Sequence, residues 1–190
     1  MGLEYQYAPG QTPIDEDEKE ALLIRTISTQ GELNEAEQIN IQTAVEWTLK
    51  RRWDAPDILS EAFVRELHKR MYGDVWRWAG EFRQTNKNIG VDKFEIPVLL
   101  KQLLDDTQFW IGKKTYAPDE TAIRFKHRIV SIHCFPNGNG RHSRLIADVI
   151  ATHIFNEKVF SWNGGRSHYL QSLRQADQGD ITALIAFARS

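Results

Sequence analysis

The segment from Pro118 to Ile132 constrains the fold more than any other part of the chain. Pro118 suits the first turn of a helix, and Asp119 and Glu120 favour the positive end of a helix dipole. Apolar residues then occur on nearly all sides of the expected helix: Ala122, Ile123, Phe125, Ile129, Val130 and Ile132. A helix with this pattern is usually buried over most of its surface. We therefore expect a helical bundle with this segment in its middle.

Most of the remaining chain repeats the helical spacing. Helices are predicted at residues 34–51, 60–73, 97–112, 139–155, 166–176 and 180–190. Asn34 and Glu37 resemble a capping box for the first of them, and Ser60 can cap the second. Residues 80–97 interrupt the pattern with β-forming residues separated by Asn and Gly, which indicates a small β-hairpin. The predicted fold class is all-α with one hairpin.

The length of 190 residues suits one domain. Residues 1–20 contain two prolines and an acidic cluster, and we interpret them as a surface arm before a single domain at 21–190. No stretch approaches the ~20 apolar residues of a membrane span, and the N-terminus lacks a signal peptide's pattern. The single cysteine, Cys134, excludes an internal disulfide and fits a cytoplasmic protein.

The charge balance of the chain argues against nucleic acid as a partner. The chain has 24 Lys and Arg residues against 26 Asp and Glu residues, a formal net charge of −2. This balance supplies no general field that attracts nucleic acid. We therefore expect neither direct nucleic-acid binding nor membrane binding.

The loop after the central helix has the features of an anion site. Gly138 and Gly140 flank Asn139, so the backbone can approach a ligand without an intervening Cβ atom. The helix that follows presents unpaired N–H groups at its start. Arg141 and Arg144 are three residues apart on its first turn, so both guanidinium groups can bind successive phosphates. Phosphate is the expected ligand.

His133 adds a proton acceptor to this loop. An unperturbed histidine titrates near pH ~6.5, so it is suited to take a proton from a hydroxyl group at neutral pH. A turn rich in Asn and Gly is more often structural than catalytic when it stands alone. Here a base, an anion site and two arginines in helical register occur within 12 residues, which favours catalysis. The other histidines show no metal-binding spacing and are expected at the surface or the core edge: His68, His127, His142, His153 and His168.

Residues 133–144, His-Cys-Phe-Pro-Asn-Gly-Asn-Gly-Arg-His-Ser-Arg, resemble the signature of the Fic family. That signature is His, any residue, Phe, any residue, an acidic residue, Gly-Asn-Gly-Arg, two further residues and Arg. Eleven of the twelve positions are compatible. Residues 83–90 resemble the family's flap, and residues 169–180 resemble its terminal helices. The whole chain is similar to the bacterial subgroup called mobile mystery protein B.

The resemblance implies an all-α Fic fold and a protein adenylyltransferase, which transfers AMP from ATP to a Ser, Thr or Tyr hydroxyl group of a target protein. His133 would be the base, and Phe135 would pack beneath the loop. The backbone of Gly138, Asn139 and Gly140 would hold phosphate oxygens, while Arg141 and Arg144 would bind the β- and γ-phosphates. Tyr169 and Asp177 match positions that line the adenosine pocket of relatives. Asn88, Ile89 and Gly90 match the flap that pairs with the target.

One position departs from the family pattern. The acidic residue that coordinates Mg²⁺ in the family is Asn137 here. An amide oxygen is a poorer ligand for this hard cation than a carboxylate, which weakens the use of Mg²⁺ without excluding it. The subgroup resemblance also implies a helix-turn-helix partner protein.

Residues 21–55 are expected to include an inhibitory helix. Ser28 to Glu32 resembles the family's inhibitory motif, in which the glutamate would pair with Arg144 and block productive binding of the γ-phosphate. Leu33 departs from that motif, so Glu32 alternatively only precedes the helix capped by Asn34. Three other functions stay open: a catalytically weak nucleotide-binding regulator, a Fic-type phosphotransferase, and a transferase of another nucleotide.

Overall fold

The computed structural model describes residues 19–190, so the expected acidic arm at 1–20 lies almost entirely outside the described residues. The helices are α2 (Gln30–Leu49), α3 (Ala55–Ile58), α4 (Glu61–Tyr72), α5 (Ile96–Lys113), α6 (Pro118–Ile132), α7 (Asn139–Val149), a turn of π-helix η1 (Ile150–Ile154), α8 (Arg166–Asp177) and α9 (Thr182–Arg189). The predicted all-α class is confirmed, because the described residues form one isolated β-bridge, between Leu22 and Trp76, and no strand ladder. None of these helices combines the length and apolar character of a membrane span.

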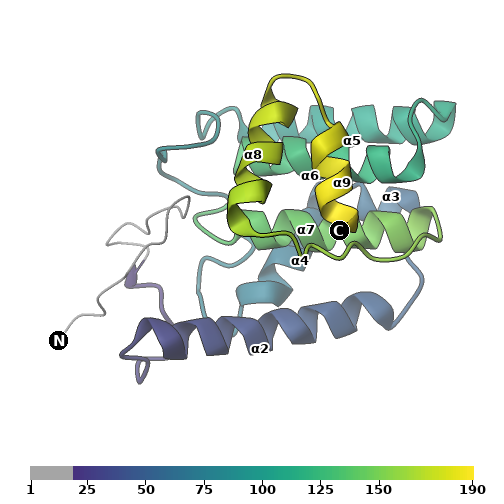
Figure 1. Ribbon diagram of the computed structural model, residues 1–190. Helices are drawn as coiled ribbons and strands as arrows, with labels where there is room; N and C mark the ends of the chain where they lie inside the picture. The colour runs from purple at the N-terminus through teal and green to yellow at the C-terminus, as the bar shows by residue number, and fades with distance from the viewer. Residues whose placement is uncertain (1–18) are drawn as a thin grey trace.

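α6 lies in the middle of the bundle, as its apolar surface predicts. It packs against α5, α7, η1 and α9, and α4 contacts both α7 and α2. In Figure 1, α2 runs along the lower edge, α7 crosses the middle, and α8 and α9 lie above it as a pair. The side chains of Ala122, Ile123 and Phe125 on α6 are fully buried. α7 is buried near its start, at Asn139, and near its end, at Val149, so the core fixes the position of the loop before it.

Local signals explain where α4 begins and what it buries. The hydroxyl oxygen of Ser60 accepts a hydrogen bond from Phe63 N at 3.1 Å, which caps the helix at its first turn. Phe63, Val64 and Leu67 are buried at helical spacing. The predicted helix at 60–73 is thus confirmed with its cap.

α2 begins at Gln30, four residues earlier than predicted. Thr29 and Glu32 form the capping box: Glu32 N donates to Thr29 Oγ1 at 3.2 Å, and Thr29 N donates to Glu32 Oε2 at 3.0 Å. Asn34 consequently lies inside the helix, and the predicted box of Asn34 and Glu37 is wrong. Glu37 is turned inward instead and is buried.

The predicted hairpin at 80–97 does not form; its residues adopt turns and bends up to the start of α5. The buried guanidinium group of Arg83 donates to the carbonyl oxygens of His133 (2.7 Å), Thr85 (2.9 Å) and Val91. Asn86 Oδ1 accepts a hydrogen bond from Lys93 N at 2.8 Å. These side chains therefore form hydrogen bonds with backbone groups that would pair with a neighbouring strand in a hairpin.

Candidate functional site

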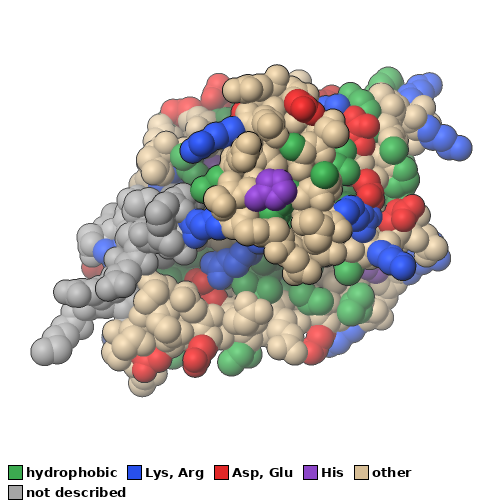
Figure 2. All heavy atoms as spheres, in the orientation of Figure 1, with side chains coloured by type: hydrophobic (Ala, Val, Ile, Leu, Met, Phe, Trp, Pro, Cys, Tyr) green, Lys and Arg blue, Asp and Glu red, His purple; other side chains and the backbone are tan. Residues whose placement is uncertain are grey.

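Most of the predicted site residues meet at one cavity of about 720 Å³. Its wall includes His133, residues 137–140, Arg141, Arg144 and Tyr169. Figure 2 shows Lys and Arg side chains in the hollow between α2 below and α8 above. The N-terminal end of α2 completes the wall on one side. The first turn of α7 and two arginines thus face a common space.

The backbone of the loop between α6 and α7 is fixed by its own side chains. Asn139 Oδ1 accepts from Phe135 N at 3.0 Å, and Asn139 Nδ2 donates to Phe135 O at 2.8 Å. Gly138 has φ of +77°, and a Cβ atom there would lie 2.5 Å from the ring of Tyr72. Only glycine fits this position without strain. The side chain of Asn139 therefore shapes the loop, while its N–H group belongs to the first turn of α7, whose N–H groups have no partner within the helix.

A buried aromatic layer supports the loop from below. Phe135 is fully buried, and its ring stacks on His68 with 3.7 Å between centroids. Gly80 N donates to His68 Nδ1 at 3.0 Å, which leaves His68 Nε2 to donate to Asn137 O at 3.0 Å. Burial lowers the pKa of His68 well below its usual range, so the ring is neutral. Phe135 packs as expected, and His68 holds the loop.

The expectation that all five other histidines lie at the surface or the core edge is wrong for His68 and His142. His142 is 1% exposed and donates from Nε2 to Val64 O at 3.0 Å, and burial lowers its pKa to about 4. The signal was available for His68, which follows Leu67 on the buried face of α4. Both rings are structural supports of the site.

His133 lies at the wall of the cavity and is 5% exposed. It ends α6 in the left-handed conformation, with φ of 58°. Burial, followed by the nearby charges of Arg83 and Lys87, lowers the pKa of His133 to about 4. The imidazole ring is therefore neutral at neutral pH and can accept a proton, although it is a weaker base than an exposed histidine.

Arg141 is paired with a carboxylate that the sequence analysis did not assign to the site. Arg141 Nη1 donates to Glu37 Oε2 at 2.7 Å, and Glu37 Oε1 accepts from Trp76 Nε1 at 2.7 Å. Glu37 is 6% exposed and lines the cavity. The available signal was the helix register: with α2 starting at Gln30, Glu37 follows Leu33 by one turn on the buried face.

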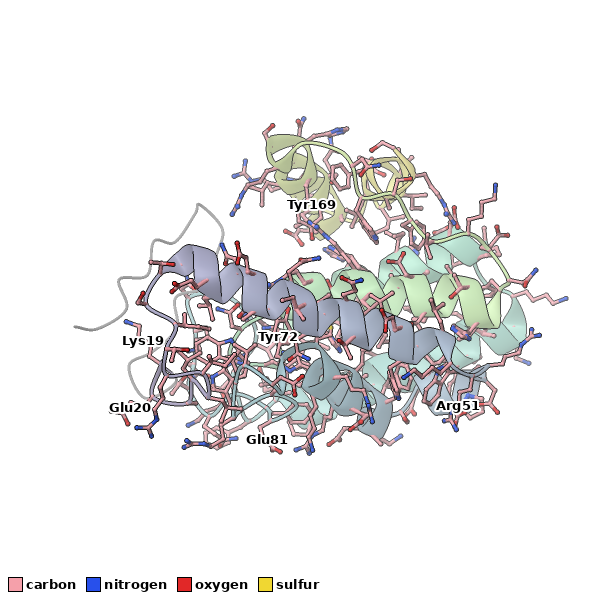
Figure 3. The ribbon with its side chains drawn as sticks, turned by 90° about the horizontal axis from the view of Figure 1, so that it is seen from below. Lys19, Glu20, Arg51, Tyr72, Glu81 and Tyr169 are labelled. Atoms are coloured by element: carbon pink, nitrogen blue, oxygen red, sulfur yellow. The ribbon has the colours of Figure 1, made fainter. Side chains whose placement is uncertain are left out.

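Within residues 19–190, Arg144 lies beside aromatic rings and forms no ion pair. Its guanidinium carbon lies 4.6 Å from the ring centre of Tyr169 and 5.7 Å from that of Trp162. Its buried Nε atom has no hydrogen-bond partner within residues 19–190. Figure 3 labels Tyr169 on α8. A cation in this setting favours the arrival of an anion.

The expected pair of Glu32 with Arg144 is not formed in the described structure. Glu32 Oε2 accepts hydrogen bonds from Ser28 N at 2.7 Å and from Ser28 Oγ at 3.1 Å, in addition to the bond from Thr29. These bonds lower the pKa of Glu32. Ser28 and Glu32 thus stabilise the start of α2, and Glu37 is the residue of α2 that binds an arginine of the site.

The flap residues and Asp177 have different positions. Ile89 lines the cavity, and Gly90 lies so close to His133 that a Cβ atom would be 2.6 Å from the Cβ atom of His133. Asn88 is exposed and is not part of the wall. Asp177 also lies outside the wall, with Oδ1 2.7 Å from His127 Nε2. The structure therefore brings Ile89, Gly90 and Tyr169 to the site but not Asn88 or Asp177.

The donor groups at Asn137 do not fit a Mg²⁺ site built by the protein. Asn137 Oδ1 already accepts a hydrogen bond from Gly138 N at 2.6 Å. No group of three or more His, Cys, Asp or Glu side chains within residues 19–190 is arranged to hold a metal ion. A protein site for Mg²⁺ normally supplies one or two carboxylates, and this loop supplies one amide.

Sequence comparison relates this chain to one family. Residues 58–151 match the Fic/DOC family. A protein from Aedes aegypti named protein adenylyltransferase Fic is 28% identical over 135 residues, which are 69% of this chain and 27% of that protein. This chain therefore spans about a quarter of the length of that relative.

Solved structures share the fold. The N-terminal Fic domain of a VirB-translocated Bep effector protein from Bartonella quintana has a TM-score of 0.72 at 15% identity, covering 87% of this chain and 84% of that chain. The BepC protein from Bartonella tribocorum, solved with bound AMPPNP, has a TM-score of 0.69 at 16% identity, covering 92% of this chain and 97% of that chain. At these identities the likeness is one of fold.

Proposed function

Because this chain belongs to the Fic/DOC family, we propose that it is a protein adenylyltransferase, which transfers AMP from ATP to a hydroxyl group of a target protein. The observation that carries the proposal is the meeting of His133, Arg141, Arg144 and the first turn of α7 at one cavity. The relative from Aedes aegypti supports the chemistry by its name. The AMPPNP bound to BepC supports a nucleotide as the ligand.

In the proposed step, the hydroxyl oxygen of the target forms a bond to the α-phosphorus of ATP, and the bond from that phosphorus to pyrophosphate breaks. His133 takes the hydroxyl proton, for which its neutral ring is ready at neutral pH. The N–H groups of Asn139 and Gly140 face the phosphate oxygens, and Arg141 and Arg144 neutralise the charge that develops on pyrophosphate. The protein thus supplies a base and a positively charged cradle.

We propose that the flap, residues 83–90, binds the target protein. We also propose that any Mg²⁺ would be held mainly by the phosphates of ATP. Ile89 and Gly90 lie beside His133, so an extended target segment bound along them would bring its hydroxyl group to the base. Asn137 offers a single amide oxygen to a metal ion. A cytoplasmic location and a helix-turn-helix partner are further proposals that rest on the family resemblance.

We also propose that Glu37 restrains the enzyme. Its carboxylate binds Arg141 at 2.7 Å and therefore competes with the phosphates of ATP for that cation. This ion pair favours a resting form of the enzyme with low activity. In that form the protein would behave as the catalytically weak regulator that is the alternative function. Glu32 has no part in this proposal, because its oxygens are engaged by Ser28 and Thr29.

The test follows labelled ATP. The protein is incubated with cell lysate and ATP that carries the label in the α- or the γ-position. We expect transfer of the α-label and its loss by roughly 10²-fold or more in His133→Ala, which removes the base. The exposed histidine variant His168→Ala, a matched control, should transfer as the parent does.

Other outcomes would contradict parts of the proposal. Transfer of the γ-label would identify a phosphotransferase, and preference for UTP or GTP would identify another nucleotide. Undiminished α-label transfer in His133→Ala would rule out its role as the base. Binding of ATP without any transfer would support the regulator.

A further inference from the structure

A buried lysine lies behind the wall of the cavity. Lys126, on α6, is fully buried and is not part of the wall. Its Nζ atom donates to Tyr169 Oη at 2.5 Å and lies 4.6 Å from the centre of the Tyr169 ring. Tyr169 itself lines the cavity (Figure 3). One tyrosine therefore separates the ammonium group from the space assigned to nucleotide.

Tyr169 lies close to two basic side chains. The guanidinium carbon of Arg144 lies 4.6 Å from the same ring centre. Within residues 19–190, neither Lys126 nor Arg144 has a carboxylate oxygen within ion-pair distance. Keeping both groups charged without a counter-ion would be unfavourable, because Lys126 is buried and Arg144 is partly buried, and an anion at this wall would relieve that cost.

We propose that Lys126 is a positioning residue of the nucleotide site, which holds Tyr169 beside Arg144 and takes up a proton when a polyphosphate binds there. The inference rests on the proposed function, since it assumes that the cavity binds nucleotide. It extends that function because it couples nucleotide affinity to pH through a residue that does not touch the ligand.

The surroundings of Lys126 favour its neutral form before the ligand arrives. Burial, followed by repulsion from Arg144 on α7, lowers the pKa of Lys126 to about 7. Asp177 on α8 acts in the opposite direction, but its carboxylate is engaged by His127. Tyr169 contributes a hydrogen bond and no negative charge, because burial raises the pKa of its phenol.

Other titratable groups on the elements around α6 have partners of their own. They are Asp106 of α5 with Arg128, Arg189 of α9 with Asp119, Asp148 of α7 with Phe160 N, Arg141 of α7 with Glu37, His142 of α7 with Val64 O, and His153 of η1 with Trp53 N. None of them forms a bond to Lys126 in the described structure. A bound polyphosphate would therefore be the main new charge that Lys126 experiences.

The expected consequence is proton uptake that depends on pH. A polyanion beside Arg144 stabilises the charged form of Lys126 and raises its pKa. At pH 8 the free protein holds this group mostly neutral, so binding should take up close to one proton. At pH 6 the group is already charged, and uptake should approach zero. Affinity should therefore fall by up to about tenfold for each pH unit above pH 7.

The experiment is calorimetry of the full chain at pH 6 and pH 8 in two buffers with different heats of ionisation. The probes are AMPPNP and inorganic tripolyphosphate, with adenosine as an uncharged control. We expect uptake at pH 8 with both anions and none with adenosine. Lys126→Met should lose this uptake and the pH dependence of affinity, while protonation of the ligand itself stays common to all variants.

Two further variants keep the test decisive. Lys126→Arg carries a permanent charge, so it should bind without uptake and retain its affinity at pH 8.5. Lys101→Met removes an exposed lysine that pairs with Asp105, and it should keep the uptake of the parent. If Lys126→Met does not fold, Lys126→Arg and the parent still give the answer.

The two failures can be told apart. Binding of AMPPNP with equal uptake in the parent and in Lys126→Arg, or with no uptake in the parent at pH 8, would overturn the role of Lys126 and leave the proposed nucleotide site intact. Failure of the parent to bind either anion would overturn the nucleotide site, and this inference with it.

Discussion

At the scale of the residue, Glu37 joins the start of the chain to the site. Its two carboxylate oxygens bind different elements, Trp76 in the segment after α4 and Arg141 on α7. Glu37 is almost fully buried, whereas the side chain of Arg141 is 42% exposed and faces the cavity. A ligand can therefore reach the cation while the carboxylate holds it from behind. Glu37 orients Arg141, and under the proposed function it would also compete with an incoming phosphate.

We expect Glu37→Gln to separate these two effects. The amide keeps an acceptor for Trp76 but loses the charge that attracts Arg141, so the free energy of unfolding should fall by about 1–3 kcal/mol without nucleotide. Stabilisation by AMPPNP should increase, because Arg141 is released for the phosphates. Melting temperatures with and without AMPPNP measure both quantities. Glu35→Gln, on an exposed position of the same helix, is the control. An equal AMPPNP effect in Glu37→Gln and the parent would make the pair purely structural.

At the scale of the element, the first turn of α2 decides which carboxylate reaches the site. The capping box of Thr29 and Glu32 fixes the helix start, and that start sets the register in which Leu33 and Glu37 face inward. Glu32 is exposed and serves the helix end. Since its bonds lower its pKa, Glu32 stabilises the protein above its ordinary pKa, and this contribution is lost as pH falls through the lowered value.

We expect Glu32→Gly to lower the melting temperature slightly at neutral pH and to leave AMPPNP binding and AMP transfer unchanged. Thr29→Ala removes the other half of the box and should cost about 1 kcal/mol, with the same unchanged binding. Thermal unfolding and calorimetry with AMPPNP provide the comparison. Tighter AMPPNP binding in Glu32→Gly alone would show that Glu32 reaches Arg144 in solution.

At the scale of the whole molecule, local patterns predicted the helices and the chemical loop but not the contacts between distant segments. Helical spacing located α4 to α9, because apolar residues recur at intervals of three and four along these segments. The hairpin prediction failed because Arg83 binds the carbonyl of His133, 50 residues away. The pairs Glu37 with Arg141 and Lys126 with Tyr169 join elements that no local pattern relates. The sequence therefore predicted the kinds of residue that line the cavity. It did not predict which buried side chains pair with them.

The buried histidines are also expected to make the free energy of unfolding depend on pH. His68, His133 and His142 have pKa values lowered by burial, to about 4 for the last two. A lowered pKa contributes stability above the unfolded value of ~6.5 that is lost as pH falls toward the folded value. Asp148 acts in the opposite sense, since burial raises its pKa to about 6 and it stabilises the fold at lower pH. Between pH 6 and 5, the unfolded chain therefore binds more protons at the three histidines than the folded protein gains at Asp148, and stability falls as the pH falls.

We accordingly expect the free energy of unfolding to fall by about 2–3 kcal/mol per pH unit near pH 5, which corresponds to the net release of roughly two protons on folding. Denaturant unfolding at closely spaced pH values measures this slope. His142→Gln can retain a donor toward Val64 O but cannot titrate, so it should be less stable at pH 7 by about 1–3 kcal/mol and should lower the slope by roughly one proton. His168→Gln, at an exposed position, should leave the slope as it is. A slope that is identical in His142→Gln and the parent would mean that His142 is protonated in the folded protein, and the neutral aromatic layer beneath the loop would then be wrong.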